Sequence, residues 1–120
     1  PAPQRMLVSE SRDEGRTWSF ARHNDLLNPG ASVEGVVLAD GRWLLCGNDT
    51  EEGRHSLAFW ISENEGRSWS TPMTVERAAK DSGLSWHYPS LIQTRDGSVH
   101  LTASHFTPGG KTMRHWMFKV

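Results

Sequence analysis

Tyr88 and Arg54 have the side chains with the most specific chemistry in this chain. Tyr88 lies in a Trp-His-Tyr-Pro run, and a phenol can act as a nucleophile when a nearby carboxylate takes its proton. Arg54 ends an acidic loop, and its planar guanidinium can bind a carboxylate through two parallel hydrogen bonds. Each also has a structural alternative: Tyr88 would anchor a strand through its hydroxyl, or Arg54 would pair with Glu51 or Glu52.

Six histidines raise the question of a metal site. His100, His105 and His115 are the nearest to one another, but their spacing matches no zinc signature. Strand alternation would also place His100 and His105 on opposite faces of one strand. The single Cys46 cannot form a disulfide within the chain and suits a small buried position on a strand. The sequence therefore predicts neither a metal site nor a cofactor.

An octapeptide occurs twice, as Ser-Arg-Asp-Glu-Gly-Arg-Thr-Trp at 11–18 and as Ser-Glu-Asn-Glu-Gly-Arg-Ser-Trp at 62–69. The copies begin at residues 11 and 62, so they are 51 residues apart, a period typical of propeller blades. Each copy has the chemistry of a tight loop between strands. The Asp or Asn and the hydroxyls can bond loop amides, the Gly supplies a positive φ, and the Trp is expected to be buried as the next strand begins.

Short alternating runs separated by turn residues predict strands along the whole chain. Asp-Gly pairs at 40–41 and 96–97 predict two similar hairpins. We expect outer strands of one blade over 1–22, including a strand at 18–20. A complete four-stranded blade is expected over 33–75, and three strands of a further blade over 86–120. A polar crossing segment is expected at 23–32.

The octapeptide pattern Ser-x-Asp-x-Gly-x-Thr-Trp resembles the Asp-box, or BNR repeat, of the sialidase (neuraminidase) superfamily. The resemblance covers nearly the whole chain and is strongest to bacterial sialidase-like proteins. It implies an all-β fold with about two four-stranded antiparallel blades of a six-bladed β-propeller, from the C-terminal portion of a longer protein. Because this box lies on the outer rim of such propellers, it predicts the fold and not an activity.

The same resemblance implies roles for individual residues. Tyr88 matches the family's nucleophilic tyrosine, which suits a sugar that carries a carboxylate at its anomeric carbon because a neutral phenol is not repelled by that charge. Arg54 matches one arginine of the trio that clamps the sugar carboxylate. His87, Asn48 and Trp86 are the further candidates for substrate binding, with core packing as the alternative for Trp86.

The match is weaker at the base that would activate the tyrosine. Ser32 occupies the position where the family carries a glutamate, and Glu34, two residues later on the same strand face, is our candidate instead. The sequence predicts the C-terminal part of a sialidase-like glycoside hydrolase that acts on a terminal acidic sugar in the propeller funnel. The alternative is a non-catalytic, lectin-like propeller that binds carbohydrate or protein, and Ser32 favours it.

Composition limits the partners. The net charge is −1 and no basic stripe is present, which argues against nucleic acid. No apolar run approaches the ~18 residues that span a bilayer, so no membrane partner is expected. The predicted partners are a carbohydrate and either the remaining blades of a parent chain or further copies of this one, because unpaired blade edges favour association. The chain alone is predicted to be inactive, because the family's acid/base residue and its other arginines would lie in other blades.

Overall fold

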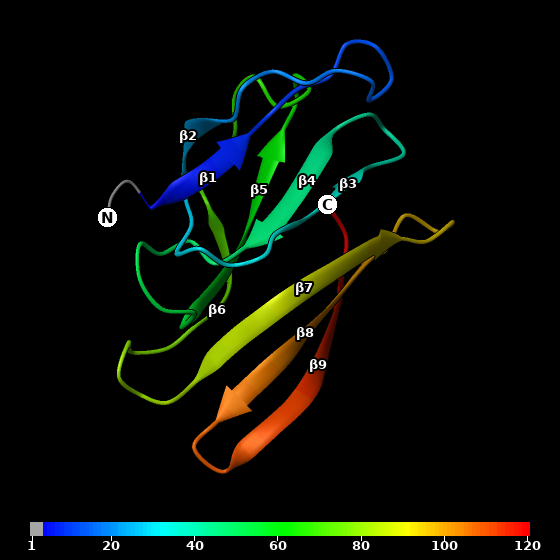
Figure 1. Cartoon of the computed structure of the whole chain (residues 1–120). Coiled ribbons are helices and arrows are strands. Elements are labelled where there is room, and N and C mark those ends of the chain that lie inside the picture. The colour runs from blue at the N-terminus through cyan, green and yellow to red at the C-terminus, as the bar shows by residue number, and fades with distance from the viewer. Residues whose placement is uncertain (1–3) are drawn as a thin grey trace.

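The computed structural model describes residues 4–120, which form antiparallel strands joined by loops (Figure 1). In chain order the strands are β1 (Arg5–Val8), β2 (Arg22–Leu27), β3 (Glu34–Val37), β4 (Trp43–Gly47), β5 (Ser56–Ser62), β6 (Met73–Arg77), β7 (Ser85–Gln93), β8 (Val99–Thr107) and β9 (Gly110–Phe118). They make a two-stranded sheet, β1-β2, a four-stranded sheet, β3-β4-β5-β6, and a three-stranded sheet, β7-β8-β9. The predicted all-β, antiparallel fold class is confirmed. Residues 4–120 contain no helix that is long and apolar enough to cross a membrane.

The four-stranded sheet lies between the other two and is packed on both faces. Leu57 and Phe59 of β5 join the core shared with the β7-β8-β9 sheet, where they meet residues such as Leu101. Trp60 points the other way and packs against Met6 and Leu26 of the two-stranded sheet. Successive side chains of a strand point to opposite faces, so a strand buried on both sides needs the continuous apolar run found in β5.

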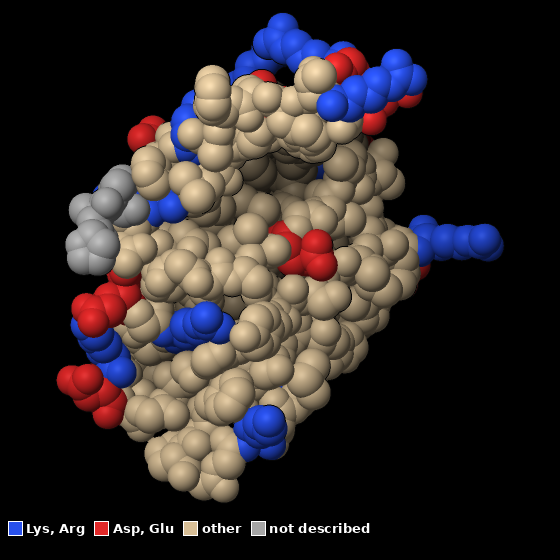
Figure 2. Space-filling view, in the orientation of Figure 1, with Lys and Arg blue, Asp and Glu red and all other residues tan. Residues whose placement is uncertain are grey.

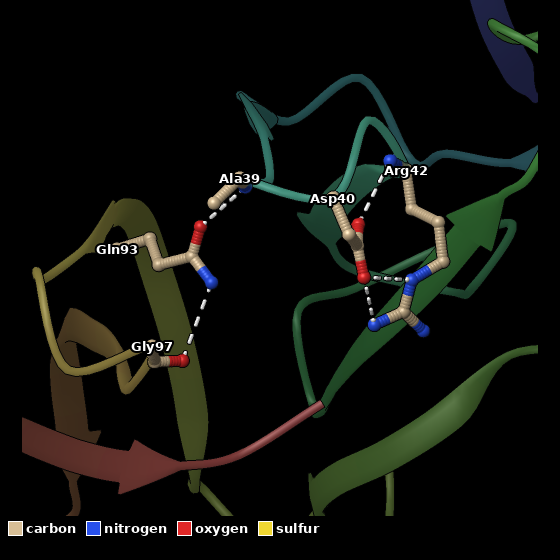
Figure 3. Close-up of polar contacts among 5 residues, drawn as sticks. All are labelled: Ala39, Asp40, Arg42, Gln93 and Gly97. Atoms are coloured by element: carbon tan, nitrogen blue, oxygen red, sulfur yellow. Dashed lines mark hydrogen bonds and ion pairs between the residues drawn. The ribbon is translucent and has the colours of Figure 1, made fainter.

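The two Asp-Gly hairpins form as predicted and are tied to each other (Figure 3). In the first, the Asp40 carboxylate accepts hydrogen bonds from the Arg42 backbone N–H at 3.0 Å and from its Nε at 2.8 Å. Gln93, at the end of β7, accepts the N–H of Ala39 at 2.7 Å and donates to the carbonyl of Gly97 at 3.3 Å. One side chain therefore links the turns of two neighbouring sheets.

The two octapeptide loops share several internal hydrogen bonds. The hydroxyl of Ser11 accepts the N–H of Gly15 at 2.8 Å, as the hydroxyl of Ser62 accepts that of Gly66 at 2.8 Å. The tryptophans differ, and the prediction that both are buried was wrong for the first. Trp69 is partly buried against the cluster of Met6, Leu26 and Trp60, whereas Trp18 is 62% exposed. The Trp18 indole instead donates to the Gly15 carbonyl of its own loop at 3.0 Å.

The segment after the first octapeptide also differs from expectation. Residues 18–20 form no strand, and β2 lies at 22–27, of which all but the first residue fall in the expected crossing segment. A backbone bond from the Ser19 N–H to the Glu10 carbonyl at 2.8 Å is accompanied here by serine side-chain bonds: Ser9 Oγ donates to the Ser19 carbonyl at 2.6 Å, and Ser19 Oγ accepts the Glu10 N–H at 2.9 Å. The strand pairing with β1 therefore resumes only where β2 begins.

The first octapeptide loop is expected to depend on pH, because its central residue is Asp13 and not Asn. Hydrogen bonds from the Thr17 hydroxyl and amide lower the pKa of Asp13 to about 2. Because folding lowers the pKa of Asp13, its ionised carboxylate stabilises the folded loop at pH values above the ordinary pKa of 3.8. This stabilisation is lost as the pH falls through about 2. NMR titration of the Asp13 carboxyl carbon should show this low pKa. The Asp13→Asn variant gives the first loop the asparagine that the second loop has at Asn64. In this variant the Thr17 amide signal should no longer change with pH. A titration near 3.8 would contradict the geometry of this loop.

Candidate functional site

Arg54, His87 and Tyr88 meet where the loop between β4 and β5 contacts the start of β7. The Trp86 N–H donates to the Arg54 carbonyl at 2.9 Å, which joins the loop to the strand. Arg54 Nη1 lies 3.1 Å from Nδ1 of His87, and the guanidinium carbon lies 5.5 Å from the centre of the Tyr88 ring. The structure therefore brings three of the six predicted site residues into one cluster, here called the Arg54 cluster.

Arg54 has no carboxylate partner among residues 4–120. The two nearby candidates for a surface ion pair bind other cations: Glu51 pairs with Arg5 at 3.4 Å, and Glu52 with Lys80 at 2.9 Å. The alternative, in which Arg54 pairs with Glu51 or Glu52, is therefore not found in the structure. The Arg54 guanidinium is half-buried and lies over the aromatic face of Tyr88, without an ion-pair partner among the described residues.

Tyr88 has a backbone conformation that is unusual for its residue type. Its φ is +55°, although it is not a glycine and precedes Pro89. It lies in the irregularity of register between His87 and Ser90, and its side chain is 63% exposed. Within residues 4–120 its hydroxyl has no hydrogen-bond partner, so it does not anchor the strand. Backbone strain of this kind concentrates at functional sites and supports a role for the exposed phenol.

His87 is held on both of its ring nitrogens. Nε2 lies 2.8 Å from the hydroxyl of Ser85, and Nδ1 faces Arg54. The Phe106 ring of β8 covers the imidazole at 4.4 Å between centroids. Burial, followed by the charge of Arg54, lowers the pKa of His87 below its ordinary value. Sequence reasoning missed Ser85, although its place two residues before His87 on a strand puts both side chains on one face.

Asn48 and Trp86 lie inside the fold and not beside open space. Asn48 is fully buried, and its Nδ2 donates to the carbonyls of Ser56 at 2.8 Å and Trp86 at 3.1 Å. Trp86 is 4% exposed and stacks on His105 at 4.9 Å between centroids. Their burial therefore does not favour direct contact of either side chain with a ligand. Both residues join the β4–β5 loop to β7 and so position the Arg54 cluster.

Glu34, the candidate base, begins β3 opposite Cys46. One of its carboxylate oxygens accepts the N–H of Gly35 at 3.2 Å. Burial raises the pKa of the Cys46 thiol, and the charge of Glu34 adds to this effect. Among the residues described, no carboxylate contacts the Tyr88 hydroxyl, so the cluster has a candidate nucleophile without its base.

A large groove lies elsewhere in the molecule. A groove of about 1620 Å³ separates the β1-β2 sheet from β3 and β4, and apolar side chains such as Met6, Leu26 and Leu45 line it. Figure 2 shows this hollow in the upper part of the molecule, walled mainly by uncharged residues. No residue of the Arg54 cluster lines it. The groove marks where the face of the four-stranded sheet is incompletely covered.

Of His100, His105 and His115, only His100 and His115 lie together in the structure. His100 Nδ1 and His115 Nε2 lie 2.9 Å apart on β8 and β9, while His105 stacks on Trp86 on the other face of β8. In the part of the chain that the structure describes, no three His, Cys, Asp or Glu side chains are grouped so as to hold a metal ion.

Comparison with known proteins places the chain in a family. The model of the BNR repeat-like domain matches residues 2–101. The chain belongs to this BNR repeat-like domain family. The comparison with curated proteins found no match.

One solved structure resembles this BNR repeat-like chain over nearly its full length. It is the α-L-arabinanase of Penicillium chrysogenum in complex with arabinobiose, with a TM-score of 0.69 and 17% identity. The alignment covers 99% of this chain and 40% of the arabinanase chain. The likeness shows the fold, that of part of a β-propeller, and the chain spans less than half the length of that relative.

Proposed function

We propose that this chain forms part of the funnel wall of a sialidase-like propeller that binds and cleaves a terminal acidic sugar. In this proposal Arg54 binds the sugar carboxylate and Tyr88 is the nucleophile. The observation that carries it is the placement of Arg54, which has no carboxylate partner within residues 4–120 and lies 5.5 Å over the exposed ring of Tyr88.

The contact between the Arg54 guanidinium and the Tyr88 ring is consistent with a particular class of sugar. In an acidic sugar whose carboxylate is attached directly to the anomeric carbon, clamping the carboxylate on Arg54 would bring that carbon toward Tyr88. The phenol oxygen then attacks the anomeric carbon as its proton passes to a base, the bond to the leaving-group oxygen breaks, and that oxygen takes a proton from a general acid. Water later cleaves the bond between the sugar and Tyr88. We assign the general acid to another part of the propeller.

Glu34 keeps a place in this proposal as the candidate for the base. It lies on β3, a strand in contact with β7, but its carboxylate is bonded to the Gly35 N–H. To take the proton of Tyr88, this side chain would have to rotate away from its own backbone. His87, by contrast, already contacts Arg54, and we assign it to the carboxylate subsite.

A lectin-like propeller is the second candidate, and one observation favours it. Tyr88 has no carboxylate beside it in residues 4–120, and Ser32 stands where a base is expected. A site with a carboxylate clamp but no activated nucleophile would bind the acidic sugar without cleaving it.

The test uses the full-length protein that contains this chain and three fluorogenic substrates of matched leaving group. These are a sialoside, a neutral galactoside and an arabinofuranoside. We expect cleavage of the sialoside alone. Binding of the sialoside without cleavage would favour the lectin-like candidate. Cleavage of a neutral glycoside alone would rule out the acidic-sugar proposal.

Residues 1–120 on their own are expected to cleave none of these substrates. A glycosidase needs its nucleophile, its acid/base group and its clamp to converge on one sugar ring, and the Arg54 cluster supplies only part of this set. The measurement is turnover of the sialoside by the 120-residue chain, with its oligomeric state followed by light scattering. Cleavage by a monomer would show that the chain contains the whole machinery.

A further inference from the structure

We propose that His87 couples carboxylate binding at Arg54 to the uptake of one proton. The inference rests on the proposed function of Arg54 and extends it. In the free site, Nδ1 of His87 accepts a hydrogen bond from Arg54. In the occupied site, the same nitrogen is protonated and donates to the bound carboxylate.

The first step is the tautomer of His87 in the free protein. A guanidinium only donates hydrogen bonds and keeps its charge in proteins. Nδ1 of His87, 3.1 Å from Arg54 Nη1, must therefore be the acceptor and carry no proton. The proton of the neutral ring is then on Nε2, which donates to the hydroxyl of Ser85 at 2.8 Å. Geometry alone thus sets the neutral ring in one tautomer.

The second step is the charge around the ring. Arg54 contacts it directly from the β4–β5 loop, and the neighbouring Tyr88 contributes a phenol at 6.1 Å between centroids. From β8 the uncharged Phe106 covers the ring, and Lys111 of β9 lies 5.9 Å from the centroid of that phenylalanine. The two charged groups that contact His87 or the phenylalanine covering it are therefore cations, which oppose a further positive charge on His87.

The third step is the arrival of an anion. A carboxylate on Arg54 replaces this repulsion by attraction, so the pKa of His87 rises on binding. Protonated His87 then presents an Nδ1–H to the anion beside Arg54. Nε2 donates to Ser85 in both states, so only the contact with Arg54 has to change. Because the complex holds more protons than the free protein, affinity increases as the pH falls between the two pKa values.

Calorimetric titration of the full-length protein with N-acetylneuraminic acid tests this coupling. Between about pH 8 and pH 5 we expect the dissociation constant of the wild type to fall on the order of tenfold, which corresponds to a shift of about one pKa unit. Buffers of different ionisation enthalpy should reveal proton uptake. His87→Gln keeps a hydrogen-bond acceptor for Arg54 but cannot titrate in this range, so its affinity should not depend on pH.

A second readout does not require any ligand. In the same protein labelled with ¹⁵N-histidine, His87 should show an unprotonated Nδ1 and a protonated Nε2 at about pH 8, and Arg54→Gln should raise the pKa of His87. A proton on Nδ1 in the free protein would overturn the inference, as would an equal pH dependence of binding in His87→Gln. Absence of binding to the wild type at every pH would overturn the carboxylate site itself, and this inference with it.

Discussion

Tyr88→Phe is expected to reduce sialoside turnover by the full-length protein by at least about 10³-fold, because the change removes the nucleophilic oxygen and keeps the ring. The ring would still lie below Arg54, so the dissociation constant of the acidic sugar should stay close to that of the wild type. The measurement is kcat with the fluorogenic sialoside, beside calorimetric affinity for the free sugar.

Ile92→Ala provides a control on the same strand, since its side chain is 57% exposed and lies outside the Arg54 cluster. It should leave turnover unchanged. A Tyr88→Phe variant that turns over at the wild-type rate would remove Tyr88 from the mechanism. Loss of sugar binding as well would show that the phenol oxygen acts in binding.

Trp60→Ala is expected to have the largest effect on stability, about 3–5 kcal/mol of unfolding free energy, as for other buried aromatic truncations. Trp60 is 2% exposed and is the centre of the core that joins the β1-β2 sheet to the four-stranded sheet. Its removal opens a cavity between two sheets that are joined by few other buried side chains. Urea denaturation followed by circular dichroism gives the free energy.

Phe20→Ala is the matched control, because Phe20 is 99% exposed. It should change the unfolding free energy by no more than about 0.5 kcal/mol. Equal effects of the two substitutions would contradict the packing of the β1-β2 sheet on Trp60.

The features predicted well from sequence are those set by local chemistry. The Asp-Gly pairs at 40–41 and 96–97 specify tight turns, and the octapeptides at 11–18 and 62–69 specify loops through their own side chains. Strand β2 was missed because its Arg-His-Asn-Asp start has little strand character. Its pairing with β1 overrides this local preference.

The arrangement of the candidate site could not be predicted from the sequence, for a related reason. Tyr88 and Arg54 were selected one by one, but their contact depends on the docking of the β4–β5 loop against β7, which no local pattern encodes. The burial of Asn48 and Trp86 also follows from this docking. The pairing of Glu51 with Arg5 and of Glu52 with Lys80, and not with Arg54, is likewise visible only in three dimensions.

The central claim is that Arg54 binds a carboxylate. Its most direct test is a comparison of N-acetylneuraminic acid with its methyl ester, which keeps the sugar and removes the charge, by calorimetry on the full-length protein. We predict that the wild type binds the acid and not the ester. Arg54→Gln should lose about 1.5–3 kcal/mol of affinity for the acid, the range of a hydrogen bond to a charged group. Equal binding of acid and ester by the wild type, or unchanged affinity in Arg54→Gln, would contradict the account.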